Sequence, residues 1–176
     1  MGFGIAVFGA FDINSLGDML FPKALEFELG RRIQVHKMVF FSPSDAQSEY
    51  NNGYEIYPYK EFEKIHEAVQ FDAIIIGGGE LLHNNEIKFT NIHGETISYQ
   101  NGRIWKYPVE MGRKHHIKVL VNSVGMPYTI SRDDREMLAE LDYLSFRDKY
   151  SFYRFCGERR ILGSHVVPDS LWNLDD

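Results

Sequence analysis

The chain has 176 residues, of which 44% are hydrophobic and 25% charged, as in a globular protein that forms one domain around its own core. Its net charge of -6 argues against a general nucleic-acid role, because the phosphate backbone is bound by a basic face. The single cysteine excludes an intrachain disulfide, and no apolar run approaches the ~20 residues of a transmembrane segment. The N-terminus lacks the basic region of a signal peptide, so a cytoplasmic location is expected.

The beginning of the chain predicts a strand, a helix and a second strand. Residues 5–8 form a short apolar run between two glycines and indicate a buried strand. A helix is predicted over residues 18–29, because Asp18 can cap its free N–H groups and Pro22 then falls in the first turn. Residues 35–41 predict the second strand.

The middle of the chain contains the strongest strand signal. A polar, turn-rich loop at residues 42–59 and a short amphipathic helix at residues 60–70 are predicted before it. Residues 72–77 then place three isoleucines in a row, which is typical of a parallel strand covered on both faces. Residues 81–102 show no clear period and are predicted to form a long loop that is functional or mobile.

The last third of the chain continues the alternation of helices and strands. A helix is predicted over residues 105–115, with Pro108 in its first turn. The elements after it are a strand at residues 118–125, a helix at 131–141 capped by Ser131, a strand at 143–146, a helix at 148–155 and a strand at 165–167. This order predicts an α/β fold, with a doubly wound, mostly parallel sheet and helices on both faces, in a single domain over residues 1–176.

In such a sheet, ligands bind outside the carboxyl ends of the strands. The glycine loop, Gly77, Gly78 and Gly79, follows the isoleucine strand and allows either tight packing or the close approach of a ligand. It lacks the third spaced glycine of a dinucleotide loop and the Gly-Lys-Ser/Thr ending of a P-loop. Arg147 follows a later strand and can fork onto a carboxylate or phosphate, or pair with a neighbouring acid such as Asp148.

Histidines and paired acids offer weaker candidates for chemistry. His83 follows the glycine loop and is a candidate for proton transfer, although a lone loop histidine is more often solvated. Asp133 and Asp134 look like a metal-binding pair, but their place at a helix start explains them better. The seven histidines show no metal-ligand spacing with cysteine or acidic residues, so neither a metal nor a cofactor is predicted.

Five segments in order resemble the motifs of the polysaccharide pyruvyl transferase family. Their order and spacing extend over nearly the whole chain and are more specific than any one segment. The first has one more residue between its asparagine and glycine than the family's Asn-x-Gly-Asp opening. The segments are Asn14-Ser15-Leu16-Gly17-Asp18 with Leu20 and Pro22, the strand and loop from Asp72 to Gly79, Asn122-Ser123-Val124-Gly125, Ser145-Phe146-Arg147-Asp148 with Ser151, and Val167-Pro168-Asp169.

The resemblance implies a reaction and its partners. It implies that a pyruvyl unit moves from phosphoenolpyruvate onto two hydroxyls of a sugar in a cell-surface polysaccharide, forming a ketal while phosphate leaves. Phosphoenolpyruvate and a sugar or glycan acceptor are thus the expected partners, and a homo-oligomer is compatible with this interpretation. Proton transfer would fall to Asp18 or His83. The substrate-binding residues implied are Asn14, Gly17, Gly77, Gly78, Gly79, Ser123, Arg147 and Asp169.

The resemblance also implies a larger architecture. In family members a second Rossmann-like half forms the other wall of the cleft, so the chain is expected to be the N-terminal half of a longer, GT-B-like protein. Two alternatives remain open. One is a nucleotide-sugar glycosyltransferase-like domain, which shares this architecture but would call for a ribose-binding acid that the sequence does not show. The other is a non-catalytic binding or assembly module.

Overall fold

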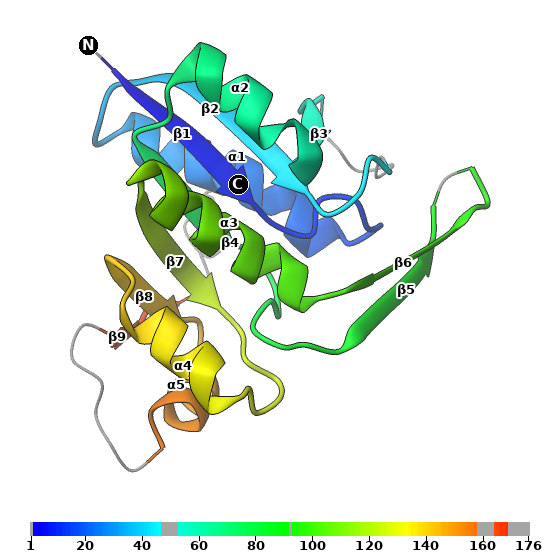
Figure 1. The fold of residues 1–176 in the computed structure, drawn as a ribbon, viewed down its shortest axis with the longest axis vertical. Helices are drawn as coiled ribbons and strands as arrows, with labels where there is room; N and C mark the ends of the chain where they lie inside the picture. Colours follow the sequence, from blue (N-terminus) through cyan, green and yellow to red (C-terminus); the bar gives the residue numbers. More distant parts are fainter. Residues whose placement is uncertain (1, 47–52, 92, 158–163, 169–176) are drawn as a thin grey trace.

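Seven parallel strands form the central sheet of the computed structural model, which describes residues 2–46, 53–91, 93–157 and 164–168 (Figure 1). The strand order β3-β2-β1-β4-β7-β8-β9 means that the chain starts within the sheet, builds one edge and then crosses to build the other. Neighbouring strands pair in parallel throughout. The strands are β1 (Phe3–Phe8), β2 (Val35–Ser42), β3 (Ile56–Pro58), β4 (Ala73–Gly77), β7 (Lys118–Val124), β8 (Tyr143–Phe146) and β9 (Ser164–Val166).

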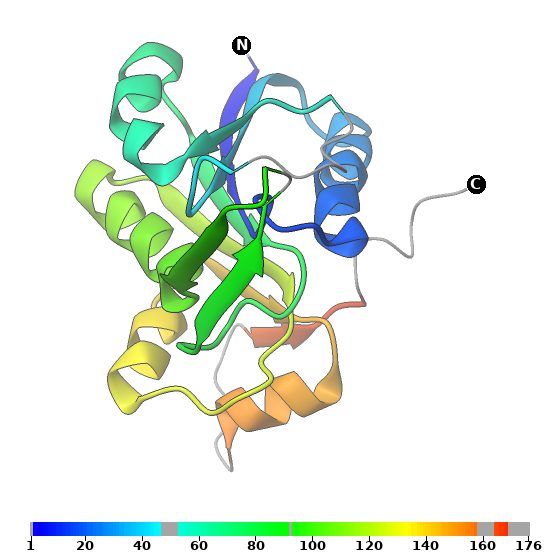
Figure 2. The ribbon, with the colours of Figure 1, turned by 90° about the vertical axis from the view of Figure 1, so that its right-hand side faces the viewer.

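Helices lie on both faces of this sheet, as the alternation of elements predicted. α1 (Leu16–Gly30) lies on one face, whereas α2 (Phe62–Val69), α3 (Gly102–His115) and α4 (Arg132–Ala139) lie on the other (Figure 2). α5 (Lys149–Cys156) packs beside β8 and β9. The prediction of a doubly wound α/β fold is therefore confirmed. No helix in the described part of the chain combines the length and the apolar character that crossing a bilayer requires.

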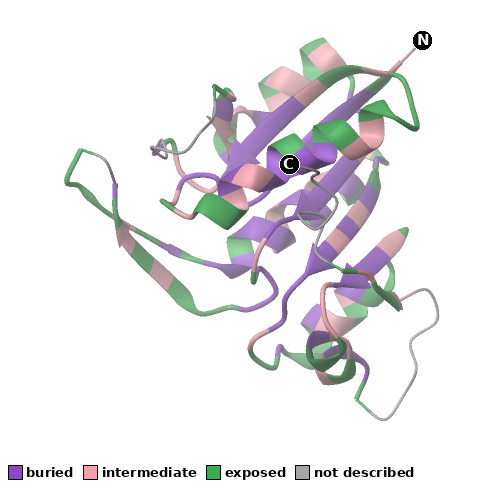
Figure 3. Ribbon diagram, turned by 180° about the vertical axis from the view of Figure 1, so that it is seen from behind, coloured by how far each residue is buried: buried purple, intermediate pink, exposed green. Residues whose placement is uncertain are grey.

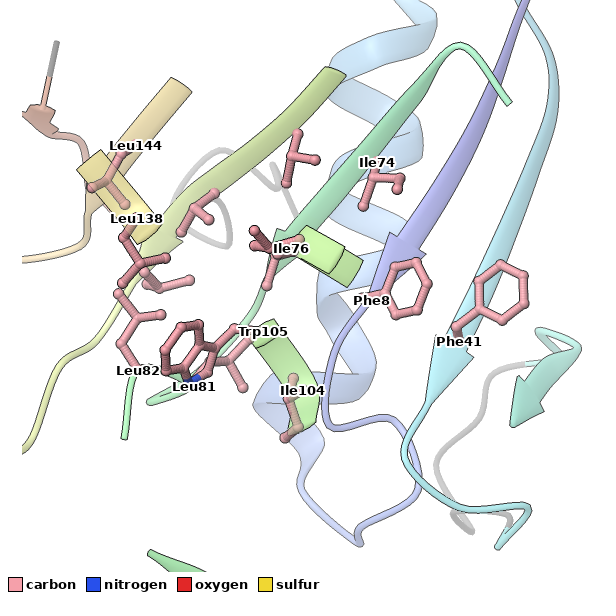
Figure 4. Close-up of a cluster of buried hydrophobic side chains, with 14 of the residues drawn as sticks. Phe8, Phe41, Ile74, Ile76, Leu81, Leu82, Ile104, Trp105, Leu138 and Leu144 are labelled. Carbon is pink, nitrogen blue, oxygen red and sulfur yellow. The ribbon is translucent and has the colours of Figure 1, made fainter. Parts of the chain in front are cut away.

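Two hydrophobic clusters fill the space on either side of the sheet. β4 contributes to both, because successive side chains of a strand point to opposite faces. Ile74 and Ile76 belong to the larger cluster, together with the fully buried Trp105 of α3 (Figure 4). Ile75 belongs to the smaller cluster, together with Phe21 of α1. This two-sided burial explains why the strand is apolar at every position.

Two helices begin earlier than predicted, α1 by two residues and α3 by three, and in both cases the prediction relied on a proline. α1 begins after the cap residue Ser15, whose Oγ accepts a hydrogen bond from the N–H of Asp18 at 3.5 Å, so the assignment of Asp18 as the cap is wrong. α3 begins at Gly102. Pro22 and Pro108 therefore lie inside their helices, where each withholds one N–H from the helical ladder. Both prolines are buried, so packing offsets the lost hydrogen bond.

The segment predicted as a long loop at residues 81–102 contains a β-hairpin. β5 (Glu86–Thr90) pairs antiparallel with β6 (Thr96–Gln100), and the hairpin extends away from the sheet (Figure 1, Figure 3). Polar and apolar residues alternate in both strands, which is the period of a half-buried strand and could have revealed the hairpin. The short edge strand β3 likewise lies within the predicted loop at residues 42–59.

A buried carboxylate ties the hairpin to the sheet. Asp12 follows β1 and is 1% exposed. Its Oδ1 accepts a hydrogen bond from the Tyr99 hydroxyl at 3.0 Å, and its Oδ2 accepts from the hydroxyl and N–H of Ser44 at 2.7 and 3.2 Å. Burial raises the pKa of Asp12 to about 6, although these hydrogen bonds act in the opposite direction. At the hairpin base, the N–H of Asn101 donates to the carbonyl of Asn85 at 2.9 Å.

The first glycine of the glycine loop has a packing role that can be tested. A Cβ added to Gly77 would overlap the ring of Phe21, which is 1% exposed and has little room to move. Gly77→Ala is therefore expected to lower the free energy of unfolding by about 2 kcal/mol through overpacking, measured by urea denaturation. Gly30→Ala is the matched control, because a Cβ there would meet no atom within 4 Å. Equal stability of the two variants would contradict this packing role.

Candidate functional site

A pocket of about 360 Å³ lies between the start of α1 and the segment that follows β4. It is at the carboxyl ends of the strands, where ligands of open α/β sheets bind. Residues from three separate parts of the chain line it: Ser15, Gly17, Asp18, Phe21, Gly78, Gly79, Glu80 and Arg147. The structure thus brings together five residues that the sequence analysis singled out, namely Gly17, Asp18, Gly78, Gly79 and Arg147.

The first turn of α1 forms one wall of the pocket. Ser15 adopts an extended conformation with φ -122° and ψ 113°, which directs its hydroxyl toward the N–H of Asp18. A Cβ added to Gly17 would meet no atom within 4 Å, so the backbone is open to the pocket at this point. The positive end of the helix dipole lies here as well and favours an anion.

The glycine loop forms the opposite wall, and its three residues do different things. Gly78 and Gly79 have positive φ angles of +87° and +66°, which side chains other than glycine rarely adopt. A Cβ on Gly79 would also overlap the carboxylate of Asp18. Gly77 does not line the pocket and instead packs against Phe21. The triple glycine therefore packs tightly at its first residue, and its other two residues line the pocket with backbone that favours glycine.

Arg147 comes directly after β8 and reaches across to the glycine loop. Its Nη2 lies 2.5 Å from Oε1 of Glu80, whereas its Nε is 3.6 Å from Oδ2 of Asp148. The Asp148 carboxylate accepts hydrogen bonds from the N–H and hydroxyl of Ser151 at 2.7 and 2.9 Å, as the cap of α5. Glu80 is therefore the main partner of the guanidinium, in line with the predicted pairing with a nearby acid.

Backbone hydrogen bonds join the loops that form this rim. The N–H of Gly125, after β7, donates to the carbonyl of Gly79 at 2.9 Å. The N–H of Arg147, after β8, donates to the carbonyl of Val124 at 3.1 Å. A Cβ on Gly125 would lie only 2.9 to 3.1 Å from Nε, Cζ and Nη2 of Arg147. The absence of a side chain at Gly125 thus lets the guanidinium lie flat against the end of β7.

Other predicted substrate-binding residues lie elsewhere. Ser123 is buried in a left-handed conformation with φ 54°, and its hydroxyl donates to the carbonyls of Val167 and Pro168 at 3.0 and 2.9 Å. It therefore joins the end of β7 to the segment after β9. Asn14 is exposed and does not line the pocket. Asp169 lies outside the described residues.

His83 also lies outside the pocket lining. It is 7% exposed, its Nδ1 accepts a hydrogen bond from the N–H of Asn85 at 3.2 Å, and its ring meets Tyr128 edge-on. Burial lowers the pKa of His83, and the negative charge of Glu80 offsets part of that shift. In this arrangement the imidazole supports the segment that leads from the glycine loop into the hairpin.

The charged groups of the pocket are two carboxylates, from Asp18 and Glu80, and the Arg147 guanidinium. Sequence reasoning named Asp18 and Arg147 but gave no role to Glu80, whose only signal was its place directly after the glycine loop. Within the described ranges, no group of three or more histidine, cysteine or acidic side chains is arranged to hold a metal ion. The pocket therefore offers a forked cation, a helix start and open backbone at Gly17, which together suit a small anionic ligand.

The chain matches the model of a known protein family. A family model described as polysaccharide pyruvyl transferase matches residues 16–176, which is nearly the whole chain and includes every side chain of the pocket except Ser15. No curated protein and no solved structure matches the chain.

Proposed function

Because the chain belongs to the polysaccharide pyruvyl transferase family, we propose that the pocket between α1 and the glycine loop binds phosphoenolpyruvate as the donor of a pyruvyl group. The observation that carries the proposal is the convergence of the α1 start, the glycine loop and Arg147 on one pocket. Phosphoenolpyruvate carries a carboxylate and a phosphate, and both are groups that a guanidinium fork and a helix N-terminus bind.

The reaction that follows forms a ketal on a sugar of a polysaccharide. Carbon 2 of the donor forms bonds with two sugar hydroxyl oxygens, and its bond to the phosphate oxygen breaks. Of the two hydroxyl protons, one ends on the methylene carbon, which becomes a methyl group, and the other leaves with the phosphate. The chemistry therefore needs a group that moves protons and a cation that stabilises charge on the donor.

The residues of the pocket divide these tasks. Arg147 holds an anionic group of the donor, and the open backbone at Gly17 lets the donor approach closely, while Gly78 and Gly79 line the opposite wall. Asp18 is the group we assign to proton transfer, since its carboxylate lies against Gly79 within the pocket wall. His83 supports the loop instead, because it lies outside the lining.

The charge balance of the pocket argues for a further source of cations. One guanidinium faces two carboxylates, whereas the donor itself brings a carboxylate and a phosphate. Additional positive groups would be needed to neutralise the complex. A second Rossmann-like half that closes over this rim would supply them, so we assign the chain to the N-terminal half of a two-domain, GT-B-like enzyme.

Titration of the 176-residue chain with phosphoenolpyruvate, followed by NMR, tests the proposed donor site. We expect saturable shifts at the backbone amides of Gly17, Gly78, Gly79 and Arg147. Binding of UDP- or GDP-sugars at these amides in place of phosphoenolpyruvate would favour a glycosyltransferase-like domain. Binding of neither ligand would overturn the proposal that this chain binds the donor on its own.

The substitution Gly17→Ala is expected to weaken ligand binding without lowering the stability of the fold. Gly17→Ala is expected to leave the melting temperature unchanged or slightly raised, because the Cβ meets no atom within 4 Å and alanine favours helix. The same methyl group would project beside the helix start and weaken phosphoenolpyruvate binding roughly tenfold, about 1.4 kcal/mol. Gly30→Ala, at the other end of α1, is the control for the helix effect alone. Unchanged affinity in Gly17→Ala would show that the donor does not approach the start of α1.

A further inference from the structure

We propose that Glu80 is a built-in competitor of the donor, so that an anionic ligand must displace its carboxylate from Arg147 in order to bind. This inference deepens the proposed function and rests on it. It makes Glu80 a specificity-determining residue: the pair that it forms with Arg147 sets how much negative charge a ligand needs before it can enter the pocket.

The geometry places Glu80 where the donor's anionic group would lie. Its Oε1 is 2.5 Å from Nη2 of Arg147, and both side chains line the pocket although they are 67 residues apart in the chain. The Glu80 side chain is 56% exposed, so it can turn toward solvent without disturbing the core. The Arg147 side chain is 29% exposed and belongs to the wall of the pocket.

The guanidinium is held in place for this exchange of partners. Gly125 lies behind it, at a distance that leaves no room for a side chain. Asp148 does not compete strongly, because its oxygens accept two hydrogen bonds from Ser151. When Glu80 turns away, Arg147 therefore remains directed into the pocket and needs little rearrangement to bind another anion.

Magnitudes explain why such a competitor gives selectivity. A partly exposed ion pair contributes about 0.2–1 kcal/mol, so a strongly charged ligand breaks it at small cost. A carboxylate held on the neighbouring loop nevertheless acts at an effective concentration on the order of millimolar. A ligand with one carboxylate, such as pyruvate, competes poorly with it. Phosphoenolpyruvate adds a phosphate and gains further interactions at the helix start.

The test compares two variants that lose one negative charge each. Glu80→Gln keeps the size of the side chain and removes its charge, and Glu136→Gln removes a charge from an exposed pair with Arg132 on α4, outside the pocket lining. We expect Glu80→Gln to bind phosphoenolpyruvate up to about fivefold more tightly and to gain measurable affinity for pyruvate, while Glu136→Gln behaves like the unsubstituted chain. Unchanged or weaker phosphoenolpyruvate binding by Glu80→Gln would overturn the inference and leave the donor site itself intact.

Inorganic phosphate separates failure of the inference from failure of the proposed function. If no variant binds phosphoenolpyruvate, the proposed function is wrong for this chain, and phosphate alone then probes the Glu80–Arg147 pair. Tighter phosphate binding by Glu80→Gln than by Glu136→Gln would support competition at Arg147. Equal phosphate binding by both variants would overturn it.

Discussion

Arg147→Ala is expected to weaken phosphoenolpyruvate binding roughly 100-fold, the loss that follows when a charged hydrogen-bonding partner of an anion is removed. Arg147 is the guanidinium of the pocket, and its backbone is fixed by the bond from its N–H to the carbonyl of Val124. Alanine keeps that backbone bond, so the fold should persist while the guanidinium group is lost. Isothermal titration of the variant and the unsubstituted chain measures the effect.

Two further substitutions show whether the loss of phosphoenolpyruvate affinity comes from the guanidinium group of Arg147. Arg147→Lys keeps the charge but loses the planar pair of donors, so we expect intermediate affinity. Arg132→Ala removes an arginine from an exposed pair with Glu136 and should leave affinity unchanged. Donor affinity that is the same in Arg147→Ala as in the unsubstituted chain would exclude Arg147 from donor binding.

The second large effect concerns stability and pH. Ionisation of Asp12 should lower the free energy of unfolding by about 3 kcal/mol as the pH rises from about 4 to 7. Burial raises its pKa from 3.8 to about 6 in the folded state. Below the unfolded pKa the carboxyl is protonated in both states and its contribution to stability is fully present. As the pH rises, the unfolded state ionises first, and the contribution is lost until the pH has passed the folded pKa.

Asp12→Asn isolates this effect from other carboxyls. Asp134 acts in the opposite direction: burial alone would raise its pKa, but hydrogen bonds from Lys106 and Asn84 outweigh burial and lower it. The quantity to compare is therefore the difference between Asp12→Asn and the unsubstituted chain, from urea unfolding at several pH values. The unsubstituted chain should lose stability relative to the variant as the pH rises. Parallel pH curves would show that Asp12 does not titrate in this range.

Buried strands were predictable because a parallel strand covered on both faces is a short, uninterrupted run of apolar residues. The isoleucines of β4 point alternately to two clusters, so every position is apolar whatever its neighbours are. Helix starts were less predictable. Pro22 and Pro108 suggested first turns, but each lies inside a helix that begins two or three residues earlier than predicted, because burial of the ring offsets the missing N–H. The strength of that packing depends on the rest of the fold and is not visible in the local sequence.

The candidate site was predictable where topology decides it. Gly17, Gly79 and Arg147 each follow a strand, and the carboxyl ends of these parallel strands lie at one edge of the sheet, so their convergence follows from the fold. The partner of Arg147 could not be chosen in advance, because Asp148 is adjacent in sequence and Glu80 is distant. The structure shows that the adjacent acid caps α5, which leaves the distant one to form the pair.

The hairpin enters and leaves the rim at neighbouring points. Its base is closed by the bond from the N–H of Asn101 to Asn85, and the Asn101 side-chain amide donates to the carbonyl of Leu81 at 2.7 Å. The tip of an arm built in this way can change in length while Glu80 on one side and α3 on the other keep their positions, provided that Tyr99 keeps its bond to Asp12. Changes at the tip of such an arm would therefore leave the rim of the pocket in place, because the chain enters and leaves the arm at positions that are bonded to each other.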